Sequence, residues 1–586
     1  CGIFGYVGNR SDAAQIVLEG LKLLEYRGYD SWGVAVKKEK KLQVDKHVGK
    51  IGDAKVNLPK SFLGIGHTRW ATHGGVTEKN THPHLDCTKS IAVVHNGIVE
   101  NFQELKEDLI NKGHKFVSET DTEIISHLIE ENLKHEGFSS SVRDAFNVLK
   151  GLNAVVVANA VSKEIVAAKT GSPLVVGIGD NELFVASDAS AIVKHTKKVI
   201  FLEDNRMVIL GERLKLIRLP DGKEIKPNIH KLSWKFEETQ RGKFKHFFLK
   251  EIYDQPKILN NIAFNSLGQV EKLAKLIESA FGTFLIACGS AGYAALVATY
   301  LFSSIAKKHV NFTLGSEFKY LEDFITKKTL IIPISQSGES VDVTEPVTRA
   351  KMKGARIASI INVLGSTLYR ESDFNVLLHA GVEKAVVATK SFIAMIAVII
   401  LTAYALIGKK SEGKEMIADA AKNVAEILEE SYIKKIKKVV NFLKDKEHVY
   451  IIGRGLSYAI ALEAALKLKE VTYIHAEGFA GGELKHGVIA LIDKGTPCIV
   501  FAPNDETYAE ILSNAQEIKA RGGVIIGIGP KNNSVFDYFL ETGDLKQATM
   551  ISQVVISQLL AYYIALAKGI KDPDKPRNLA KSVTVK

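Results

Sequence analysis

The sequence predicts an α/β protein that contains two doubly wound units, and two observations carry this prediction. The chain has 586 residues, several times the usual size of one domain, so about three or four domains are expected. Two segments repeat one pattern, a buried strand that runs into a glycine turn and a helix. They read FLIACGSAGYAALVATYLF at 284–302 and VYIIGRGLSYAIALEAALKL at 449–468, and further apolar strands follow each. This pattern is typical of parallel sheets covered by helices.

The segment before these repeats alternates short apolar strands with amphipathic helices up to about Trp234. IAVVHNGIV and NAVVVANAV are examples of the strands, and TDTEIISHLIEENLKH is an example of the helices. A charged stretch, EETQRGKFKH at 237–246, then marks a boundary. We therefore expect domains at 1–236, 249–425 and 426–572, a linker at 237–248 and a C-terminal tail at 573–586.

The charge balance favours a small anionic substrate over a nucleic acid. The formal charge is +11, but 77 Lys and Arg against 66 Asp and Glu is a small excess spread along the whole chain. Only short clusters such as KKEKK at 37–41 occur, without interleaved aromatic residues. We expect small-molecule ligands and no nucleic-acid partner.

Cysteine usage and hydropathy predict a cytoplasmic protein without a membrane partner. Four cysteines and no C-x-x-C pair argue against a disulfide framework and a zinc cluster, and favour a reducing compartment. No charged leader followed by an apolar stretch opens the chain. The nearest approach to a membrane span, FIAMIAVIILTAYALI at 392–407, is shorter than the ~20 residues required and is expected to be a buried helix.

The first repeat carries a candidate phosphate site that the second lacks. After its second strand the first copy reads SQSGES at 335–340, whereas the second reads PNDETY at 503–508. Hydroxyls and a glycine at a helix N-terminus offer donors and a favourable dipole to an anion, and two acidic residues repel one. A serine-rich helix cap without a ligand is the alternative.

The thiol at position 1 is a candidate nucleophile. A free N-terminal cysteine combines an α-amine of pKa about 7.7–8.0 with a thiol of pKa about 8.5, so one residue supplies base and nucleophile. Removal of an initiator methionine before a small residue would also explain Cys1. Acyl transfer needs position 1 to be the true terminus.

Other motifs in the first domain supply the remaining parts of an acyl-transfer site. HNGIVEN at 95–101 offers the Asn96 amide and the Gly97 N–H to an oxyanion. HTRWATHGG at 67–75 offers Arg69 to a carboxylate, and SETDTE at 118–123 offers Asp121 to an ammonium. A ligand that has both a carboxylate and an ammonium is an amino acid. A thiol that attacks the side-chain amide of an amino acid releases ammonia. Each motif alone is also compatible with a structural role.

His82 and His84 in THPHLD lack a further cysteine or acidic partner at ligand spacing, so we expect no metal there and no cofactor.

The chain resembles the family of isomerising glutamine–fructose-6-phosphate aminotransferases over its full length. The resemblance rests on CGIFGYVG, EYRGYDS, HTRWATHG, HPH, VVHNGI, SETDTE, CGS, SQSGES, ALKLKE, GELKHG and the tail PRNLAKSVTV. It implies an N-terminal-nucleophile αββα glutaminase domain followed by two doubly wound sugar-isomerase (SIS) domains. It also implies a cytoplasmic homodimer that converts fructose 6-phosphate and glutamine to glucosamine 6-phosphate and glutamate, with ammonia passed internally.

The resemblance also implies residue roles. Cys1 is the expected nucleophile, with Asn96 and Gly97 as the oxyanion hole. The other implied residues bind glutamine (Arg69, Thr72, His73 and Asp121), gate the ammonia path (Trp70), bind the sugar phosphate (Ser290, Ser335, Gln336, Ser337 and Ser340), move a proton between C1 and C2 (Glu470, helped by Lys467), open the sugar ring from a partner subunit (His486) and form a Schiff base (Lys581).

The chain departs from the family pattern near the sugar. The family has Cys-Gly-Thr-Ser where this chain has Cys288, Gly289, Ser290 and Ala291, and a serine where this chain has Ala388.

Two alternative functions stay open. Another amidotransferase of the same N-terminal class, such as the phosphoribosyl type, would need an acidic pyrophosphate-binding strand. A silent sugar-phosphate sensor would not need Cys1, Glu470 and Lys581 together.

Overall fold

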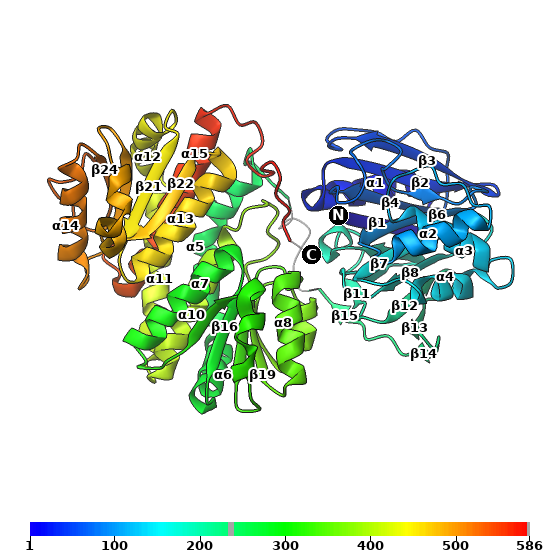
Figure 1. Ribbon diagram of the computed structural model, residues 1–586, viewed down its shortest axis with the longest axis horizontal. Helices are drawn as coiled ribbons and strands as arrows, with labels where there is room; N and C mark the ends of the chain where they lie inside the picture. Colours follow the sequence, from blue (N-terminus) through cyan, green and yellow to red (C-terminus); the bar gives the residue numbers. More distant parts are fainter. Residues whose placement is uncertain (233–239, 583–586) are drawn as a thin grey trace. The chain divides into compact units, whose positions relative to one another are not determined.

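The computed structural model describes residues 1–232 and 240–582, which divide into two compact units (Figure 1). The first unit comprises Cys1–Gln240 with Gly365–Thr367 and Ala580–Lys586, and the second comprises Arg241–Leu364 with Leu368–Leu579. The predicted boundary at 236/237 lies outside the described residues.

The first unit contains an antiparallel sheet of eight strands in the order β15-β11-β9-β10-β1-β4-β2-β3, so the N-terminal strand lies inside the sheet. Its strands are β1 (Gly2–Gly8), β2 (Ser31–Lys38), β3 (Lys41–Val48), β4 (Leu63–Arg69), β9 (Val175–Ile178), β10 (Glu182–Ala186), β11 (Lys198–Phe201) and β15 (His230–Lys231).

A second antiparallel sheet of seven strands has the order β14-β13-β12-β8-β7-β6-β5. Its strands are β5 (His84–Leu85), β6 (Ile91–Gly97), β7 (Asn153–Asn159), β8 (Ile165–Lys169), β12 (Arg206–Leu210), β13 (Lys215–Arg218) and β14 (Glu224–Ile225). The helices of this unit are α1 (Ala13–Leu24), α2 (Phe102–Asn111), α3 (Glu123–Asn132) and α4 (Phe138–Asn147).

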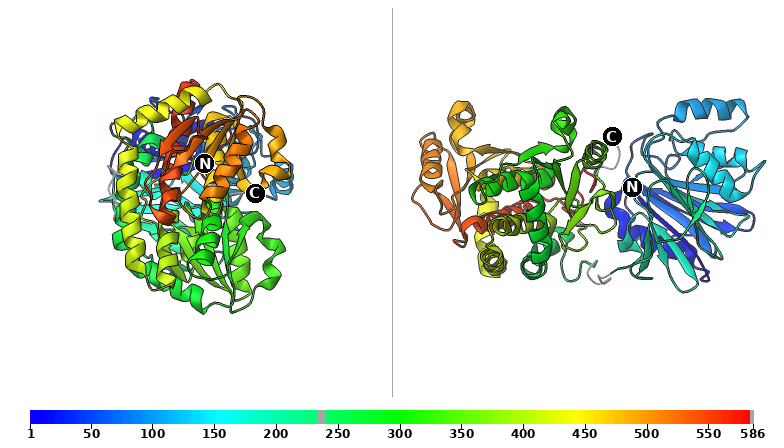
Figure 2. Two further views of the ribbon diagram at one scale, coloured as in Figure 1. Left: turned by 90° about the vertical axis from the view of Figure 1, so that its left-hand side faces the viewer. Right: turned by 90° about the horizontal axis from the view of Figure 1, so that it is seen from below.

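The alternation of side chains along the strands divides the unit into four layers. Phe4 points to the face covered by α1, whereas its neighbour Ile3 packs between the two sheets against Val94 of β6. The outer face of the second sheet packs against α2, α3 and α4, as Val93 does against Ile125. The expected αββα arrangement is thereby confirmed, and Figures 1 and 2 show these elements from three directions.

The second unit contains two parallel sheets of five strands, in the orders β17-β16-β18-β19-β20 and β22-β21-β23-β24-β25. The two orders are the same pattern, 2-1-3-4-5, which confirms the duplicated doubly wound fold. The strands are β16 (Thr283–Ala287), β17 (Asn311–Leu314), β18 (Leu330–Ser335), β19 (Arg356–Ile361), β20 (Phe374–Leu377), β21 (His448–Gly453), β22 (His475–Ala480), β23 (Pro497–Phe501), β24 (Val524–Gly529) and β25 (Tyr538–Glu541).

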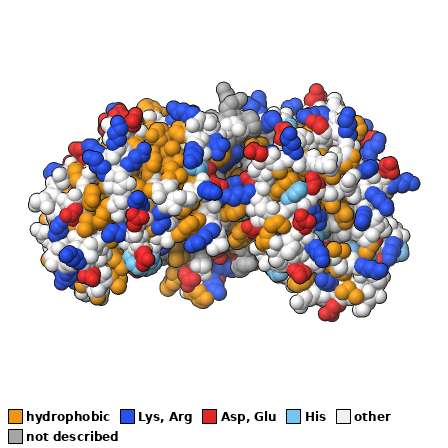
Figure 3. Space-filling model, turned by 90° about the horizontal axis from the view of Figure 1, so that it is seen from above, with side chains coloured by type: hydrophobic (Ala, Val, Ile, Leu, Met, Phe, Trp, Pro, Cys, Tyr) orange, Lys and Arg blue, Asp and Glu red, His pale blue; other side chains and the backbone are white. Residues whose placement is uncertain are grey.

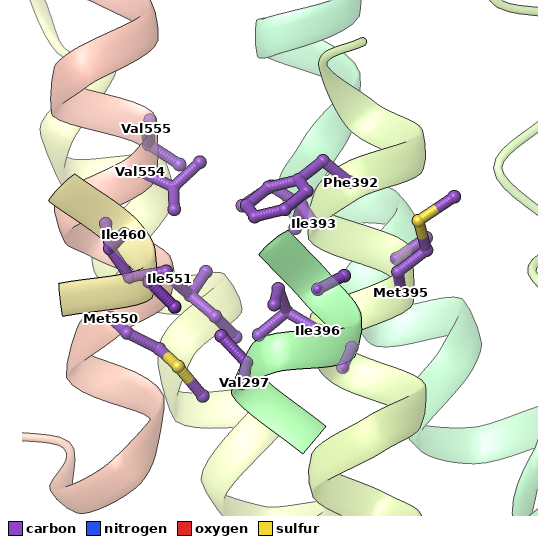
Figure 4. Packing of buried hydrophobic residues seen from close by; sticks show 14 of the residues in the cluster. Val297, Phe392, Ile393, Met395, Ile396, Ile460, Met550, Ile551, Val554 and Val555 are labelled. Carbon is purple, nitrogen blue, oxygen red and sulfur yellow. The ribbon is translucent and has the colours of Figure 1, made fainter. Parts of the chain in front are cut away.

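One continuous core joins the two copies. Helices from both copies pack together in it, and Figure 4 shows Val297 of α7, Ile396 of α10 and Ile551 of α15 directed toward one another. The helices from residue 247 onward are α5 (Phe247–Asn265), α6 (Leu267–Ser279), α7 (Gly289–Ser304), α8 (Val341–Met352), α9 (Thr367–Glu371), α10 (Lys390–Leu406), α11 (Lys410–Ile427), α12 (Glu430–Leu443), α13 (Leu456–Thr472), α14 (Tyr508–Lys519) and α15 (Thr549–Ala567).

Two helices of this core are strongly apolar. The predicted buried helix at 392–407 is α10, and it is buried as expected. The stretch that comes nearest to a membrane span is a different one, however. Lys546–Ala567, which includes α15, has sufficient length and hydropathy, and 83% of its most apolar window is buried inside the unit. It therefore packs as a core helix.

Charged side chains are mixed on the face of the molecule that Figure 3 shows, where Lys and Arg alternate with Asp and Glu. Many pair locally, as Lys112 does with Asp108. This mixture agrees with the sequence expectation of a solvated surface.

We predict that Ile551→Ala lowers the free energy of unfolding of the second unit by about 2–5 kcal/mol, because it leaves a cavity in a core that both copies share. Urea denaturation of the full chain, followed by circular dichroism, measures the change. Lys568→Ala, at the exposed end of the same helix, is the control and should change it by less than about 0.5 kcal/mol. Equal effects would mean that this core does not hold the unit together.

Candidate active sites

Cys1 lies at the start of β1, where its terminal amine and thiol meet two backbone segments. The amine donates a hydrogen bond to the Arg27 carbonyl oxygen at 2.7 Å. The thiol sulfur lies 3.3 Å from the Trp70 N–H nitrogen and 3.5 Å from the Trp70 carbonyl oxygen. Both contacts are to backbone atoms, so the position of the sulfur depends on the path of the chain after β4.

The surroundings of the amine favour its neutral form. Burial and the nearby Arg27 charge lower the pKa of the Cys1 α-amine from 8.0 to about 5, although the charge of Asp30 opposes them. At neutral pH the amine is therefore unprotonated and able to accept a proton. A base beside the thiol is what the sequence predicts for this residue.

The motif EYRGYDS explains how Arg27 is held in place. Arg27, in the 3₁₀ turn η1 (Glu25–Arg27), forms an ion pair with Asp188 at 2.7 Å, and the Tyr26 hydroxyl donates to the same carboxylate at 2.9 Å. Gly28 follows directly, and a Cβ there would lie 2.7 Å from the Arg69 carbonyl carbon. Only glycine allows this close approach of η1 to the end of β4.

Asn96 has a fixed amide orientation beside Cys1. Its Oδ1 lies 3.0 Å from His67 Nε2, and its Nδ2 donates to the Ser187 hydroxyl at 2.9 Å and toward the Cys1 carbonyl oxygen at 3.4 Å. Burial holds the pKa of His67 well below its usual value, so the neutral ring donates from Nε2 to Asn96. The amide N–H groups thus face the Cys1 side, as an oxyanion donor requires.

Gly97 adopts a backbone conformation that requires glycine. Its φ is +146°, and a Cβ there would lie 2.4 Å from the Leu152 carbonyl oxygen. The residue ends β6 and pairs with Asn153 of β7. The sequence analysis proposed the Gly97 N–H as an oxyanion donor, and the structure adds a steric reason why this residue is glycine.

The structure gives Arg69 and Asp121 local partners. Arg69 donates to the carbonyl oxygens of His73, Gly74 and Gly75, the last two at 3.0 and 3.2 Å. Asp121 Oδ2 accepts the Val99 N–H at 2.7 Å, which fixes the turn after β6. The expected carboxylate clamp at Arg69 therefore stays a prediction, since it needs these donors to turn toward a ligand.

The loop that Arg69 holds carries two further predicted residues. Thr72 is exposed, and the half-buried His73 makes an edge-to-face contact with Phe102 at 5.9 Å between ring centroids. Trp70, the expected gate residue, is half-buried directly before them.

The histidines of THPHLD pack behind Asn96. His82 stacks on His67 with ring centroids 4.2 Å apart and meets His84 at 4.8 Å. Burial lowers the pKa of His82 well below its usual value and that of His84 to about 3. This cluster therefore supports Asn96 with neutral rings.

In the second unit, the predicted phosphate residues line the turn from β18 into α8. The Gly338 N–H donates to the Ser335 hydroxyl at 2.9 Å and the Glu339 N–H to the Ser337 hydroxyl at 3.2 Å. Gly338 has a φ of +69°. Gln336 and Ser340 are half-buried in the same turn. The structure thus brings the four residues of SQSGES together at one helix N-terminus.

The equivalent turn of the second copy contains its own anion. Asp505 Oδ1 accepts the Thr507 N–H at 2.9 Å and the Thr507 hydroxyl at 2.6 Å. The Asp505 carboxylate therefore accepts the hydrogen bonds that the turn before α14 can donate. The two turns thus differ in the groups that accept their N–H donors, which are neutral serine hydroxyls in SQSGES and a carboxylate in PNDETY.

Ser290 and the candidate proton-transfer residues form one buried cluster. Ser290, at the start of α7, donates to Glu463 Oε1 at 3.1 Å and accepts from Lys467 Nζ at 3.2 Å. Lys467 also lies 2.5 Å from Glu470 Oε2. Lys467 is fully buried, whereas the Glu470 side chain is 18% exposed. The predicted shared face of α13 is present, and Ser290 comes to it from the other copy.

Sequence reasoning missed Glu463, which lies four residues before Lys467 on the same helix, 3.5 Å away. Burial raises the pKa of Glu463 to about 7, with the Glu470 charge adding to the rise and Lys467 opposing it. The two carboxylates raise the pKa of Lys467 although burial opposes them, so Lys467 stays cationic. The sequence feature that could have identified Glu463 is its position four residues before Lys467 in an otherwise apolar helix.

His486 and Lys581 lie outside the cluster on α13. His486 ends the 3₁₀ helix η6 (Gly481–His486) and is exposed, and Lys581 is half-buried. The tail before Lys581 is well anchored in the second unit. Asp574 accepts the N–H groups of Phe247 and Phe248 at 2.8 and 2.7 Å, and the Arg577 N–H donates to the Tyr473 hydroxyl at 3.0 Å.

Comparisons with known proteins match two domain families to different parts of the chain. The SIS domain family matches residues 276–405 and 442–567, and the glutamine amidotransferase domain family matches residues 67–194. The carboxyl-terminal domain of a glucosamine–fructose-6-phosphate aminotransferase from Francisella tularensis matches with a TM-score of 0.52 at 33% identity, over 56% of this chain and 98% of that one. A tagatose-6-phosphate ketose/aldose isomerase from Escherichia coli shares the fold, with a TM-score of 0.50 at 18% identity over 57% of this chain and 96% of that one.

Fold and sites thus define a glutamine amidotransferase domain joined to a pair of SIS domains. Curated relatives named glutamine–fructose-6-phosphate aminotransferase (isomerising), from Thermococcus kodakarensis and Aquifex aeolicus, are each 42% identical over the full length of both chains. The chain belongs to the family of isomerising glutamine–fructose-6-phosphate aminotransferases, and it is an enzyme.

We predict that glutamine hydrolysis rises with pH through a midpoint near 5. The amine must be unprotonated to act as base, so activity is lost as pH falls through its lowered pKa. The pH profile of kcat/KM measures the midpoint. Arg27→Gln removes a charge that lowers this pKa and should move the midpoint toward 8, whereas Arg10→Gln, an exposed arginine of the same unit, should not. A wild-type midpoint near 8 would show that the site does not lower the pKa of this amine.

Proposed function

We propose that this enzyme hydrolyses glutamine at Cys1 and delivers the ammonia to fructose 6-phosphate, which it isomerises to glucosamine 6-phosphate. The observation that carries the proposal is the buried, neutral amine of Cys1 beside a thiol and the Asn96 amide. This arrangement suits acyl transfer and has no evident structural purpose. The reaction begins hexosamine synthesis and uses no cofactor.

At the glutaminase site, the Cys1 amine takes the thiol proton while the sulfur attacks the side-chain amide of glutamine. Asn96 Nδ2 and the Gly97 N–H stabilise the oxyanion, and the amine then protonates the leaving ammonia. Water releases glutamate by the same route. Four further residues hold the glutamine through its carboxylate, its ammonium and the loop beside them: Arg69, Thr72, His73 and Asp121.

At the isomerase site, the turn Ser335–Ser340 holds the phosphate and Ser290 the sugar. Glu470 moves a proton between C1 and C2, with Lys467 beside it to stabilise the negative charge that develops. Glu463, with a pKa near 7, can hold or return a proton in the same cluster. Two carboxylates in different environments around one lysine support this assignment of acid and base roles.

The remaining assignments follow the family more than the contacts. Lys581 forms the Schiff base with the open-chain ketose, His486 opens the ring from a partner subunit, and Trp70 gates an internal ammonia path. The functional form is then a cytoplasmic homodimer. A sensor of sugar phosphates is the alternative function, and the joint presence of Cys1, Glu470 and Lys581 argues against it.

We predict that Cys1→Ala lowers glutamine hydrolysis roughly 10³-fold or more while the conversion of fructose 6-phosphate to glucose 6-phosphate continues. The Cys1 thiol belongs to the first unit, whereas the phosphate turn and the cluster on α13 belong to the second, so one chemistry can be removed alone. Coupled assays for glutamate and for glucose 6-phosphate measure both rates, and mass spectrometry checks that Cys1 is the first residue.

A variant with one residue added before Cys1 provides the matched comparison, because it keeps the thiol and converts the amine to an amide. It should lose hydrolysis nearly as fully. Glutaminase activity at the wild-type level in either variant would contradict the proposed nucleophile or base.

We predict that Ser337→Asp weakens the binding of fructose 6-phosphate at least about tenfold, since it places a charge where the phosphate dianion binds. Calorimetric titration with the sugar phosphate and with glutamine measures both affinities. Thr507→Asp, which adds the same charge to the equivalent turn of the second copy, should leave the sugar affinity unchanged. Equal weakening of both ligands by Ser337→Asp would show that the turn is structural.

A further inference from the structure

Four side chains of the first unit, which we call the Cys87 cluster, converge away from the glutaminase residues: Cys87, His114, His127 and Glu130. They come from three separate segments. Cys87 follows β5, His114 follows α2, and His127 and Glu130 lie one turn apart on α3. One ligand atom from each lies within 4.8 Å of the other three. We propose that this cluster binds one structural zinc ion.

The distances between the ligand atoms fit a tetrahedral site. Zinc bonds of about 2.0–2.3 Å place neighbouring ligand atoms about 3.3–3.8 Å apart. The Cys87 sulfur lies 3.6 Å from His127 Nδ1 and 3.9 Å from His114 Nδ1. Glu130 Oε2 lies 3.0 Å from His114 Nδ1 and 3.2 Å from His127 Nδ1. The remaining separations are within 4.8 Å, so shifts of about 1 Å or less would accommodate the ion.

The atoms around the cluster repeat the pattern that surrounds zinc ligands. Each histidine turns Nδ1 inward and has a carboxylate at Nε2, namely Glu131 at 3.1 Å for His114 and Glu123 at 3.6 Å for His127. Carboxylates in this position orient metal-bound imidazoles. The Lys115 N–H nitrogen also lies 3.5 Å from the Cys87 sulfur.

The carboxylates around His114 are compatible with a bound cation. A neutral imidazole has one N–H, and the two ring nitrogens of His114 lie 3.0 Å from Glu130 Oε2 and 3.1 Å from Glu131 Oε2. Either a doubly protonated ring or a cation at Nδ1 satisfies both oxygens, and with the cation the remaining N–H donates to Glu131. One thiolate and one carboxylate also balance the charge of a divalent ion.

The mixed sulfur, nitrogen and oxygen ligands favour zinc over magnesium or calcium, which prefer oxygen. All four positions are protein ligands, so the site is closed and structural rather than catalytic. The ion would tie the loops after β5 and α2 to α3. Asp121, proposed to bind glutamine, lies two residues before α3, so the ion would also steady that residue.

The test measures zinc in the full chain, expressed without a histidine tag in zinc-supplemented medium and gel-filtered in metal-free buffer. Mass spectrometry should find about one zinc per chain. Cys87→Ser and His127→Gln should reduce it to background, whereas His135→Gln, an exposed histidine just beyond α3, should keep it. Cobalt added to the metal-free protein should give a thiolate-to-cobalt absorption band that Cys87→Ser abolishes.

Glu131→Gln is the variant that remains informative if the others fold poorly, because it keeps all four ligands. Competition with a coloured chelator should show zinc affinity about 10–100-fold lower than in the wild type. The proposal is overturned if the wild type binds no zinc, if iron takes its place, or if zinc content and the cobalt band do not depend on Cys87. Far-ultraviolet circular dichroism spectra of the variants that match the wild type distinguish loss of the ion from loss of the fold.

Discussion

The amidotransferase unit depends on the burial of one primary amine. Lowering the pKa of the Cys1 amine from 8.0 to about 5 corresponds to a preference for the neutral form on the order of 4 kcal/mol. That preference needs a dry site, and β1 provides one because it lies inside an eight-stranded sheet. It also needs an acceptor, which the Arg27 carbonyl supplies. The Arg27–Asp188 pair and the close approach of Gly28 to the end of β4 hold that carbonyl in place.

The isomerase unit contains the same fold twice, and the two copies differ in the turn at 335–340 and its counterpart at 503–508. Both copies enter their first helix through a glycine of positive φ, Gly289 at +55° and Gly455 at +53°. In a sheet of order 2-1-3-4-5, ligands bind beyond the carboxyl ends of the strands where the order reverses. Ser290 and the turn 335–340 follow the two strands at that point in the first copy. In the second copy Asp505 fills the corresponding turn.

The sequence predicted the duplicated fold, the buried helix α10 and most of the candidate residues, because strands, glycine turns and motifs are local signals. It did not reveal the partners and the burial that each side chain acquires in the fold. Arg69 was expected to face a substrate, but its donors meet carbonyls of its own loop. Glu463 acquires its raised pKa from burial. The Cys87 cluster has no ligand spacing in the sequence, since its members come from three segments, and the cysteine pattern had argued against zinc.

The charged cluster on α13 adds little to the stability of the fold. Two carboxylates and a lysine lie in or at the edge of an apolar helix, and burying such groups costs several kcal/mol per ion unless each is paired. Here Lys467 meets both carboxylates, and Ser290 donates to one and accepts from the lysine. Well-packed apolar residues would hold α7 against α13 at least as firmly. What the charged arrangement adds is a carboxyl group with a pKa near 7 at a fixed distance from a cation, which is the property that proton transfer at neutral pH requires.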